Sequence, residues 1–246
     1  MLLIALALIA FILFRYVFVV RNVWISYRQD TAQLPEETVI RAANIDFGGS
    51  IFFLDEARIR KGVNALGTIR LEEVEVNYPS SLTLHVSRRK PVAMLLHMGE
   101  IRLLDEECCV VESADNVPDT DLIYINGMTV TAYSTGEPLQ AREAQVEAYR
   151  AMMQALSANS ANAYVSEIEL SNVDELRLIT RTGIKVELGN MQNMQNKIAW
   201  MRSAVADLEQ RSEGGGTLDV RSGNKADYRA PGVQSMPTEE PEASGR

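Results

Sequence analysis

The chain has 246 residues, 46% of them hydrophobic, which is enough to bury a sizeable core in one large domain or two small ones. Its formal net charge of -9 argues against a nucleic-acid partner, because phosphate contacts need clustered Lys and Arg. With only two histidines and two cysteines, a tetrahedral zinc site or a disulfide framework is hard to assemble.

The N-terminal segment predicts a transmembrane anchor, which we place at residues 1–17. Residues 1–14 carry no charged side chain, and apolar residues continue beyond Arg15. Counted from Leu2 to Val20, a helix would measure about 28 Å, close to the thickness of a hydrocarbon core. A cleaved signal peptide is the competing interpretation. It needs a basic stretch before the apolar run and a small-residue cleavage site, and neither is found, so a retained anchor is favoured.

The orientation of this anchor is inferred from the rest of the chain and not from charge. Arg15, Arg21 and Arg28 all lie after the apolar run, and the positive-inside rule would place them in the cytoplasm. We expect the opposite orientation, with a cytoplasmic N-terminus, because the chain beyond the anchor has the character of a secreted domain. Arg15 can snorkel to the outer interface.

Residues 18–90 predict a small α+β domain in the order strand, helix, helix, strand, strand. The expected strands are residues 18–27, 69–78 and 82–86, and the last two form a hairpin.

The helices and the turn of this small domain are predicted by local signals. Pro35 and the two acids after it open a helix that runs to about Ala43. A glycine pair then breaks the chain, and residues 51–54, Ile-Phe-Phe-Leu, predict a short buried run. Asp55 is the expected N-cap of the second helix.

Residues 91–229 predict a mostly antiparallel β domain with two helices. The expected strands are 92–97, 100–104, 109–112, 165–170, 175–180, 184–188 and 217–228, and the expected helices are 141–158 and 191–208. In the helix 191–208 apolar residues recur at spacings of three and four, which predicts a helix lying on a sheet. A Met-rich groove for a partner is the alternative. Residues 230–246, rich in Pro and Glu, predict a disordered tail.

No residue pattern in the chain predicts catalysis. Nucleophile elbow, P-loop, GxGxxG and HExxH strings are absent from the sequence. Asp105-Glu106-Glu107 is the tightest carboxylate cluster, and its place between two strands predicts a turn. Cys108 and Cys109 are expected to be packing thiols; a redox pair is the alternative. We therefore expect no enzyme activity, and no cofactor, metal or small-molecule substrate.

Several short strings occur in order along the chain. They are Leu34-Pro35-Glu36-Glu37, residues 48–52 (GGSIF), residues 78–82 (YPSSL), residues 86–93 (VSRRKPVA), residues 103–105 (LLD), residues 182–189 (TGIKVELG), Lys197 and residues 218–221 (LDVR). Together they resemble the FtsQ/DivIB family of bacterial cell-division proteins. Some positions depart from the family's pattern: Arg88 stands where Glu is usual, Cys108 where Gly is usual, and Ser222 where an aromatic residue is common.

The resemblance implies a bitopic membrane protein with a POTRA domain and a β domain outside the cytoplasm. Such proteins are scaffolds of the divisome at the septum, linking early and late division proteins through partners of the FtsB/DivIC and FtsL types. The family's partner contact is made at the final strand of the β domain, where the partner adds a strand. We expect that strand at residues 217–228, with partner binding through Leu218, Val220, Arg221 and Tyr228. A buried central strand without a partner is the alternative.

Two other classes of protein fit the sequence less well. A POTRA-containing translocation or envelope-assembly factor would have repeated POTRA units and membrane strands of about ten residues with alternating character. A cell-wall hydrolase would need a paired acid and base, a metal site or a nucleophile.

Overall fold

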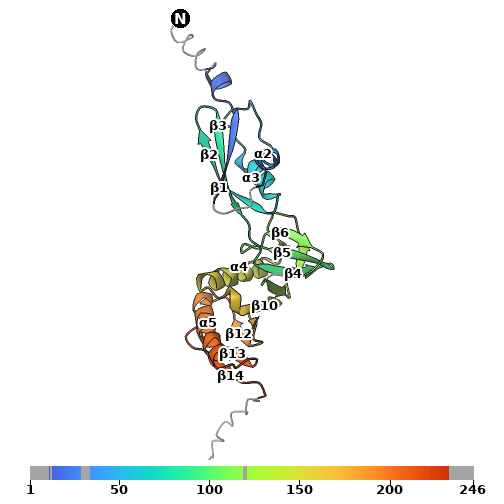
Figure 1. Ribbon diagram of the computed structural model, residues 1–246, viewed down its shortest axis with the longest axis vertical. Coiled ribbons are helices and arrows are strands. Elements are labelled where there is room, and N and C mark those ends of the chain that lie inside the picture. Colours follow the sequence, from blue (N-terminus) through green and yellow to red (C-terminus); the bar gives the residue numbers. More distant parts are fainter. Residues whose placement is uncertain (1–10, 12, 29–33, 119–120, 233–246) are drawn as a thin grey trace, which may run out of the picture. The chain divides into compact units, whose positions relative to one another are not determined.

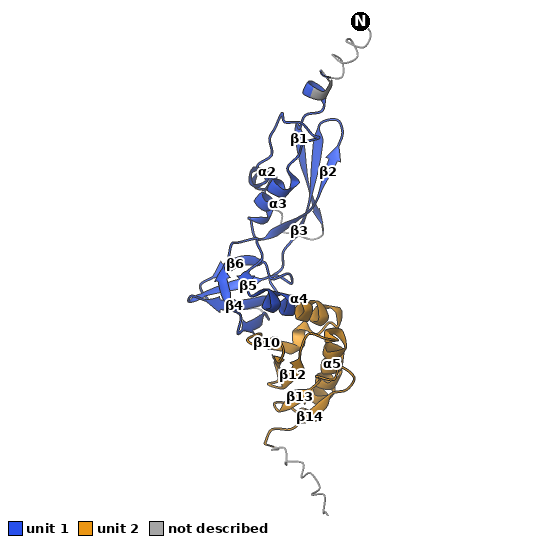
Figure 2. Cartoon of the chain, turned by 180° about the vertical axis from the view of Figure 1, so that it is seen from behind, with its two compact units in different colours: residues 1–150 blue, residues 151–246 orange. Residues whose placement is uncertain are grey.

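The computed structural model describes residues 11, 13–28, 34–118 and 121–232. The chain folds as two compact units, residues 1–150 and residues 151–246, and the division falls inside helix α4 (Figure 2). The described residues form a mixed α+β fold, as the sequence predicts. The domain boundaries expected after residues 17, 90 and 229 stay predictions.

Unit 1 begins with a short π-helix and a three-stranded sheet accompanied by two helices (Figure 1). The elements are η1 (Leu13–Val17), β1 (Asn22–Arg28), α2 (Glu36–Ala43), α3 (Glu56–Asn64), β2 (Ile69–Asn77) and β3 (Ser81–Arg88). The strand order is β1-β3-β2, with β1 parallel and β2 antiparallel to β3. The predicted order strand, helix, helix, strand, strand is therefore confirmed.

Local signals in the sequence explain the two helices. The Asp55 carboxylate accepts a hydrogen bond from the Arg58 N–H at 2.9 Å, so Asp55 is the N-cap of α3 as predicted. The first turn of α2 carries two acids, and Asn44 ends that helix in a left-handed conformation. Val39 of α2 and Ile59 of α3 are buried in a core that they share with residues of the sheet, such as Leu84 of β3.

The buried run expected at residues 51–54 is wrong. Ile51 is buried, but the exposed fractions of Phe52 and Phe53 are 46% and 79%. The backbone turns here, and the Phe53 N–H donates to the carbonyl of Ser50 at 3.3 Å. The turn directs the side chains of Phe52 and Phe53 away from the core that Ile51 enters.

The rest of unit 1 contains four neighbouring sheet strands, a small two-stranded sheet and the start of α4. The elements are β4 (Ala93–His97), β5 (Glu100–Leu104), β6 (Val110–Ala114), β7 (Ile123–Asn126), β8 (Val130–Ala132), β9 (Gln140–Ala141) and α4 (Glu143–Ala158). The four neighbouring strands follow the order β7-β4-β5-β6. The sequence predicts β4, β5 and β6 but misses the three shorter strands.

Unit 2 is a run of strands with one long helix. Its elements are η2 (Asn162–Tyr164), β10 (Val165–Glu169), β11 (Leu176–Thr180), β12 (Lys185–Gly189), α5 (Met194–Gln210), β13 (Thr217–Asp219) and β14 (Asp227–Arg229), in the sheet order β14-β13-β12-β11-β10. Helix α5 contacts β12 and buries its apolar positions, among them Ile198 and Met201. The prediction of a helix lying on a sheet is confirmed.

Two predicted segments lie mostly outside the described residues. The anchor expected at residues 1–17 is one, and the tail at residues 230–246 is the other. Within the described ranges, no helix has the length and apolar character needed to cross a bilayer.

Candidate protein-binding edge

The segment predicted as one final strand is two short strands. The chain leaves β13 at Asp219, whose carboxylate accepts a hydrogen bond from the Arg221 N–H at 3.0 Å and so closes an Asx turn. Gly223 then adopts a φ of +71°. The chain reverses and returns as β14, antiparallel to β13. The expectation of one strand over residues 217–228 is wrong because these turn signals interrupt it.

The four predicted contact residues have different surroundings. Leu218 and Val220 are fully buried, and the Val220 N–H donates to the Glu187 carbonyl at 3.1 Å. Arg221 is exposed and forms an ion pair with Asp219. Tyr228 is half-buried on β14, where its hydroxyl donates to the Gly215 carbonyl at 3.2 Å. The structure therefore separates two core side chains from two surface ones.

Strand β13 is an interior strand, because it pairs with β12 on one side and β14 on the other. The outer strand of this sheet in unit 2 is β14, and the described part of the chain contains no strand beyond it. The open edge expected from the sequence is therefore at β14 and not at the residues around Leu218.

The hydrogen-bond pattern shows which backbone groups of β14 face outward. The Lys185 N–H donates to the Gly216 carbonyl, and Val220 donates to Glu187, so alternate residues of this segment face β12. Because backbone direction alternates along a strand, Thr217 and Asp219 face β14. Their partners Arg229 and Asp227 face back toward β13. The N–H and C=O of Tyr228, between those partners, consequently point away from the sheet.

Charges of both signs surround this edge. Asp227 pairs with Lys225 at 2.7 Å, and Arg229 lies 3.8 Å from Asp219. The hydrogen bond from Arg221 lowers the pKa of Asp219 below its ordinary value. Charged side chains on a short edge strand oppose indiscriminate pairing, so an added strand must complement them. Asp227 and Arg229 are the edge residues that the sequence interpretation missed, and Gly223 was the signal for the turn before them.

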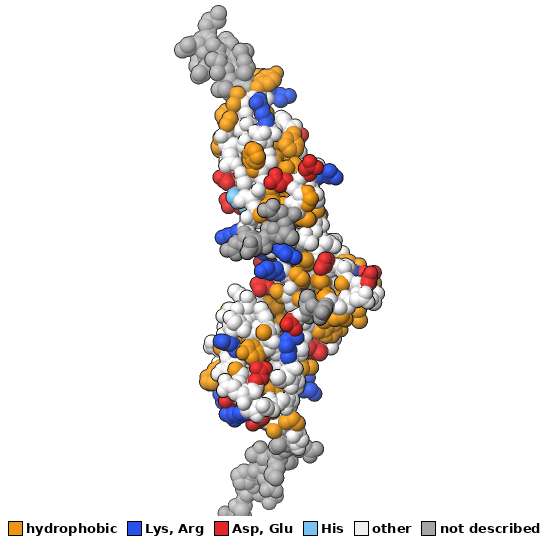
Figure 3. Space-filling model, in the orientation of Figure 1, with side chains coloured by type: hydrophobic (Ala, Val, Ile, Leu, Met, Phe, Trp, Pro, Cys, Tyr) orange, Lys and Arg blue, Asp and Glu red, His pale blue; other side chains and the backbone are white. Residues whose placement is uncertain are grey.

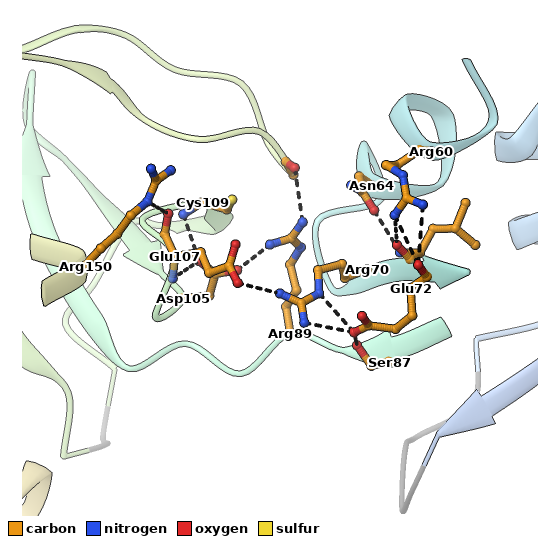
Figure 4. A network of polar contacts seen from close by, with 12 residues as sticks. Arg60, Asn64, Arg70, Glu72, Ser87, Arg89, Asp105, Glu107, Cys109 and Arg150 are labelled. Carbon is orange, nitrogen blue, oxygen red and sulfur yellow. Dashed lines mark hydrogen bonds and ion pairs between the residues drawn. The ribbon is translucent and has the colours of Figure 1, made fainter. Parts of the chain in front are cut away.

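A second polar cluster lies in unit 1, where the chain passes from β3 to β4 (Figure 4). Arg89 is buried and forms an ion pair with Asp105, and it also contacts the Gly136 carbonyl at 3.4 Å. Arg70 bridges Glu72 and Glu107, at 2.9 and 3.0 Å. Arg89 and Arg70 are each matched by a carboxylate, which favours a structural role in joining the strands.

The Asp105 turn is confirmed as a turn. The Asp105 carboxylate accepts hydrogen bonds from the N–H groups of Glu107 and Cys109, at 3.0 and 2.8 Å, so it fixes the backbone between β5 and β6. Cys108 and Cys109 are free and buried, and burial raises the pKa of the Cys108 thiol to about 12. The burial of both side chains agrees with the expectation of packing thiols.

Comparison with known proteins gives this geometry a context. A family profile described as "Cell division protein FtsQ/DivIB, C-terminal" matches residues 93–221, just over half of the chain. The cell division protein DivIB of Clostridium tetani is 20% identical over 193 residues, which cover 78% of this chain and 71% of that protein.

Two further similarities complete the comparison. The cell division protein FtsQ of Myxococcus fulvus is 27% identical over 158 residues, covering 61% of this chain and 52% of FtsQ. Among solved structures, the major extracytoplasmic domain of DivIB from Geobacillus stearothermophilus, in its trans isomer, matches with a TM-score of 0.32 and 16% identity over 50% of this chain and 97% of that domain. The resemblance predicted from the short strings is confirmed by the profile and the relatives: the chain belongs to the FtsQ/DivIB family of cell division proteins.

Proposed function

We propose that this protein is a bitopic scaffold of the bacterial divisome, which links early and late division proteins through contacts outside the cytoplasm. In this proposal residues 1–17 are a single membrane span with a cytoplasmic N-terminus, and the rest of the chain is extracytoplasmic at the septum. The partners are proteins of the FtsB/DivIC and FtsL types. Membership of the FtsQ/DivIB family and the uncharged residues 1–14 support this proposal.

The observation that carries the proposal is the outward backbone of Tyr228 on the outer strand β14. An extended partner segment would add a strand there and form main-chain hydrogen bonds with it. Arg221 and Tyr228 are the proposed contact residues, and Asp227 and Arg229 would select the partner by charge. Leu218 and Val220 are both buried, so in this proposal they stabilise the sheet that carries β14 and do not contact the partner.

The direction of each backbone N–H decides whether Val220 or Tyr228 is the better position for a proline substitution that tests partner binding. Proline at Val220 would remove the hydrogen bond from its N–H to Glu187 inside the sheet, and would therefore disturb the fold of unit 2. Proline at Tyr228 removes an outward N–H and leaves the ladder to β13 intact. Tyr228 is thus the residue at which partner binding can be changed separately from folding.

Cellular localisation tests the proposed role. A fluorescent fusion of the full chain, expressed in dividing cells, is expected to form a band at mid-cell. Uniform staining of the cell envelope would contradict a role at the septum. Co-purification of an FtsB/DivIC-type protein with the same fusion would identify the partner.

Labelling of one introduced cysteine tests the proposed topology. Met98 is 89% exposed in the turn between β4 and β5, so a Met98→Cys variant presents an accessible thiol. We expect a membrane-impermeant maleimide to label it in intact spheroplasts. The parent chain is the matched control, because Cys108 and Cys109 are buried and burial raises the pKa of both thiols. Labelling that requires lysis would place this turn in the cytoplasm and contradict the topology.

A further inference from the structure

One end of the small sheet of unit 1 carries an exposed aromatic cluster. Phe18, Phe52 and Tyr78 contact one another, with ring centroids 5.2, 5.6 and 6.3 Å apart. These residues come from three separate segments of the sequence. We call this cluster, together with the neighbouring Tyr16 and Phe53, the aromatic tip.

Backbone hydrogen bonds hold the three segments together. The Ile51 N–H donates to the Phe18 carbonyl at 3.1 Å, and the Gly48 N–H donates to the Val20 carbonyl at 2.9 Å. The Arg21 N–H donates to Ser80, in the β2–β3 turn, at 2.8 Å. The tip is therefore a built surface that belongs to the sheet.

The tip keeps much of its aromatic surface in contact with solvent. Tyr16 and Tyr78 are each 62% exposed, and Phe53 is 79% exposed. Figure 3 shows hydrophobic and Lys or Arg side chains next to one another at this end of unit 1. Several exposed aromatic side chains in one place indicate a surface that contacts something other than water.

Basic side chains accompany the aromatic ones. The Arg15 guanidinium lies 5.8 Å from the centre of the Tyr16 ring, and Arg21 donates to the Tyr16 carbonyl at 2.7 Å. The acidic residues of the adjacent loop are Asp46 and Asp55, and Asp55 is engaged as the cap of α3. The part of the tip nearest the N-terminal segment is therefore positively charged.

Chain continuity identifies the occupant of this surface. Immediately before Arg15 the sequence is an uncharged apolar run, the membrane anchor of the proposed function. Tyr and other amphipathic aromatic residues favour the level of lipid headgroups, where one end of the ring is apolar and the other is wet. Arg residues at the same level attract anionic headgroups. Because the proposed anchor is covalently continuous with the tip, the lipid bilayer is the ligand that we assign to this surface.

We infer that the aromatic tip docks into the headgroup region of the bilayer and so holds the three-stranded sheet at the membrane surface. This inference rests on the proposed anchor. It goes further, because an anchor alone would permit a free tether between bilayer and sheet, whereas docking requires the rings of the tip to enter the lipid.

Fluorescence quenching by brominated lipids tests the docking. The chain has two tryptophans, Trp24 and Trp200, so the full-length F53W/W24F/W200F variant carries a single reporter in the tip. The matched control is the W24F variant, whose reporter is Trp200, in unit 2 and 43% exposed. Both proteins are reconstituted in vesicles of phosphatidylcholine and phosphatidylglycerol with brominated acyl chains. We expect the reporter at position 53 to be quenched about twofold or more relative to Trp200.

A second pair of variants tests which side chains cause the docking. Adding Arg21→Glu and Tyr78→Ser to the reporter variant is expected to remove most of the quenching. Adding Leu96→Ser and Met98→Ser, two exposed apolar residues near the β4–β5 turn, is expected to leave it unchanged. Equal quenching in these two variants would overturn the assignment of the tip.

Alkaline extraction separates the docking from the anchor. Resistance to extraction shows an embedded anchor, and an unquenched reporter in such vesicles would then overturn the docking alone. Extraction of the protein by alkali would contradict the proposed membrane anchor. The quenching measured before extraction would still show whether the tip enters the lipid. The vesicles contain no other protein, so a tip that serves a protein partner would leave the reporter unquenched and contradict the inference.

Discussion

The outer strands β2 and β14 show two different treatments of a sheet edge. At β2 a bulge interrupts the ladder near Leu71, and α3 supplies partners for the backbone there. Asn64 accepts from the Leu71 N–H at 2.9 Å, and Arg60 donates to the carbonyls of Leu71 and Glu72 (Figure 4). At β14, within the described part of the chain, no helix forms a hydrogen bond with the outward groups of Tyr228.

The difference shows how one chain can block strand addition at one sheet edge and leave backbone hydrogen-bonding groups accessible at another. A bulge, exposed acids and side-chain hydrogen bonds make β2 a poor template for an added strand. The edge at β14 is short and charged but keeps its backbone in register with β13. Of these two edges, β14 is the one that offers outward hydrogen-bonding groups to a partner with matching charges.

The largest expected effect comes from displacing β14 from its sheet. A Cβ at Gly216 would lie 2.4 Å from the Arg229 carbonyl oxygen, and the φ of +78° is unfavourable for alanine. We expect Gly216→Ala to destabilise unit 2 by more than about 2 kcal/mol and to weaken partner capture. Chemical denaturation and co-purification measure the two effects.

Gly99→Ala is the matched control for that substitution. Gly99 has a φ of +82°, but no atom lies within 4 Å of the added Cβ. It should cost only the backbone strain, about 1 kcal/mol. Equal destabilisation by the two variants would show that the contact with Arg229 does not matter.

A smaller effect is expected from opening the protected edge. Asn64→Ala leaves the Leu71 N–H without its partner and should destabilise unit 1 by about 1–3 kcal/mol. Combined with Arg60→Ala, it should also cause self-association that rises with protein concentration, which light scattering detects. Lys61→Ala, at an exposed neighbour, is the control; a double variant that matches it in both measurements would show that β2 needs no protection.

The smallest effect concerns pH. The hydrogen bond from Arg221 lowers the folded-state pKa of Asp219 below its ordinary value of 3.8. Its stabilising contribution is therefore complete above that value and is lost as the pH falls through the folded-state pKa. Arg221→Gln should reduce stability at pH 6 by less than about 1 kcal/mol, because the Arg221 side chain is largely exposed. The deficit should shrink as the pH falls below 3.8, and thermal unfolding at several pH values measures it. A deficit independent of pH would contradict this origin.

Periodic patterns predicted the parts of the fold whose structure depends on local sequence. The helix α5 and the β2–β3 hairpin are encoded by regular spacing of apolar residues, and the cap at Asp55 by its side-chain chemistry. Short strands such as β7 and β9 depend on pairing with distant segments, which a local pattern does not encode.

The candidate site was predicted in part. The sequence pattern predicted strand structure at Leu218 and Tyr228. It placed both residues in one strand, because the turn signal at Gly223 was not taken into account. Hydrophobicity alone cannot distinguish an interior strand from an edge strand, since that depends on the order in the sheet. The same limit applies to Phe52 and Phe53, whose apolar character predicted burial and whose turn exposes them.

The most direct test of the docking edge compares Tyr228→Pro with Tyr228→Ala in the full-length chain. Both variants lose the tyrosine side chain, and only proline loses the outward N–H. We predict that affinity for an FtsB/DivIC-type partner falls about tenfold further in the proline variant, which corresponds to one hydrogen bond of about 1.4 kcal/mol. Thermal unfolding should be equal in the two variants. Equal affinities in two equally folded variants would contradict the claim that the partner pairs with the backbone of β14.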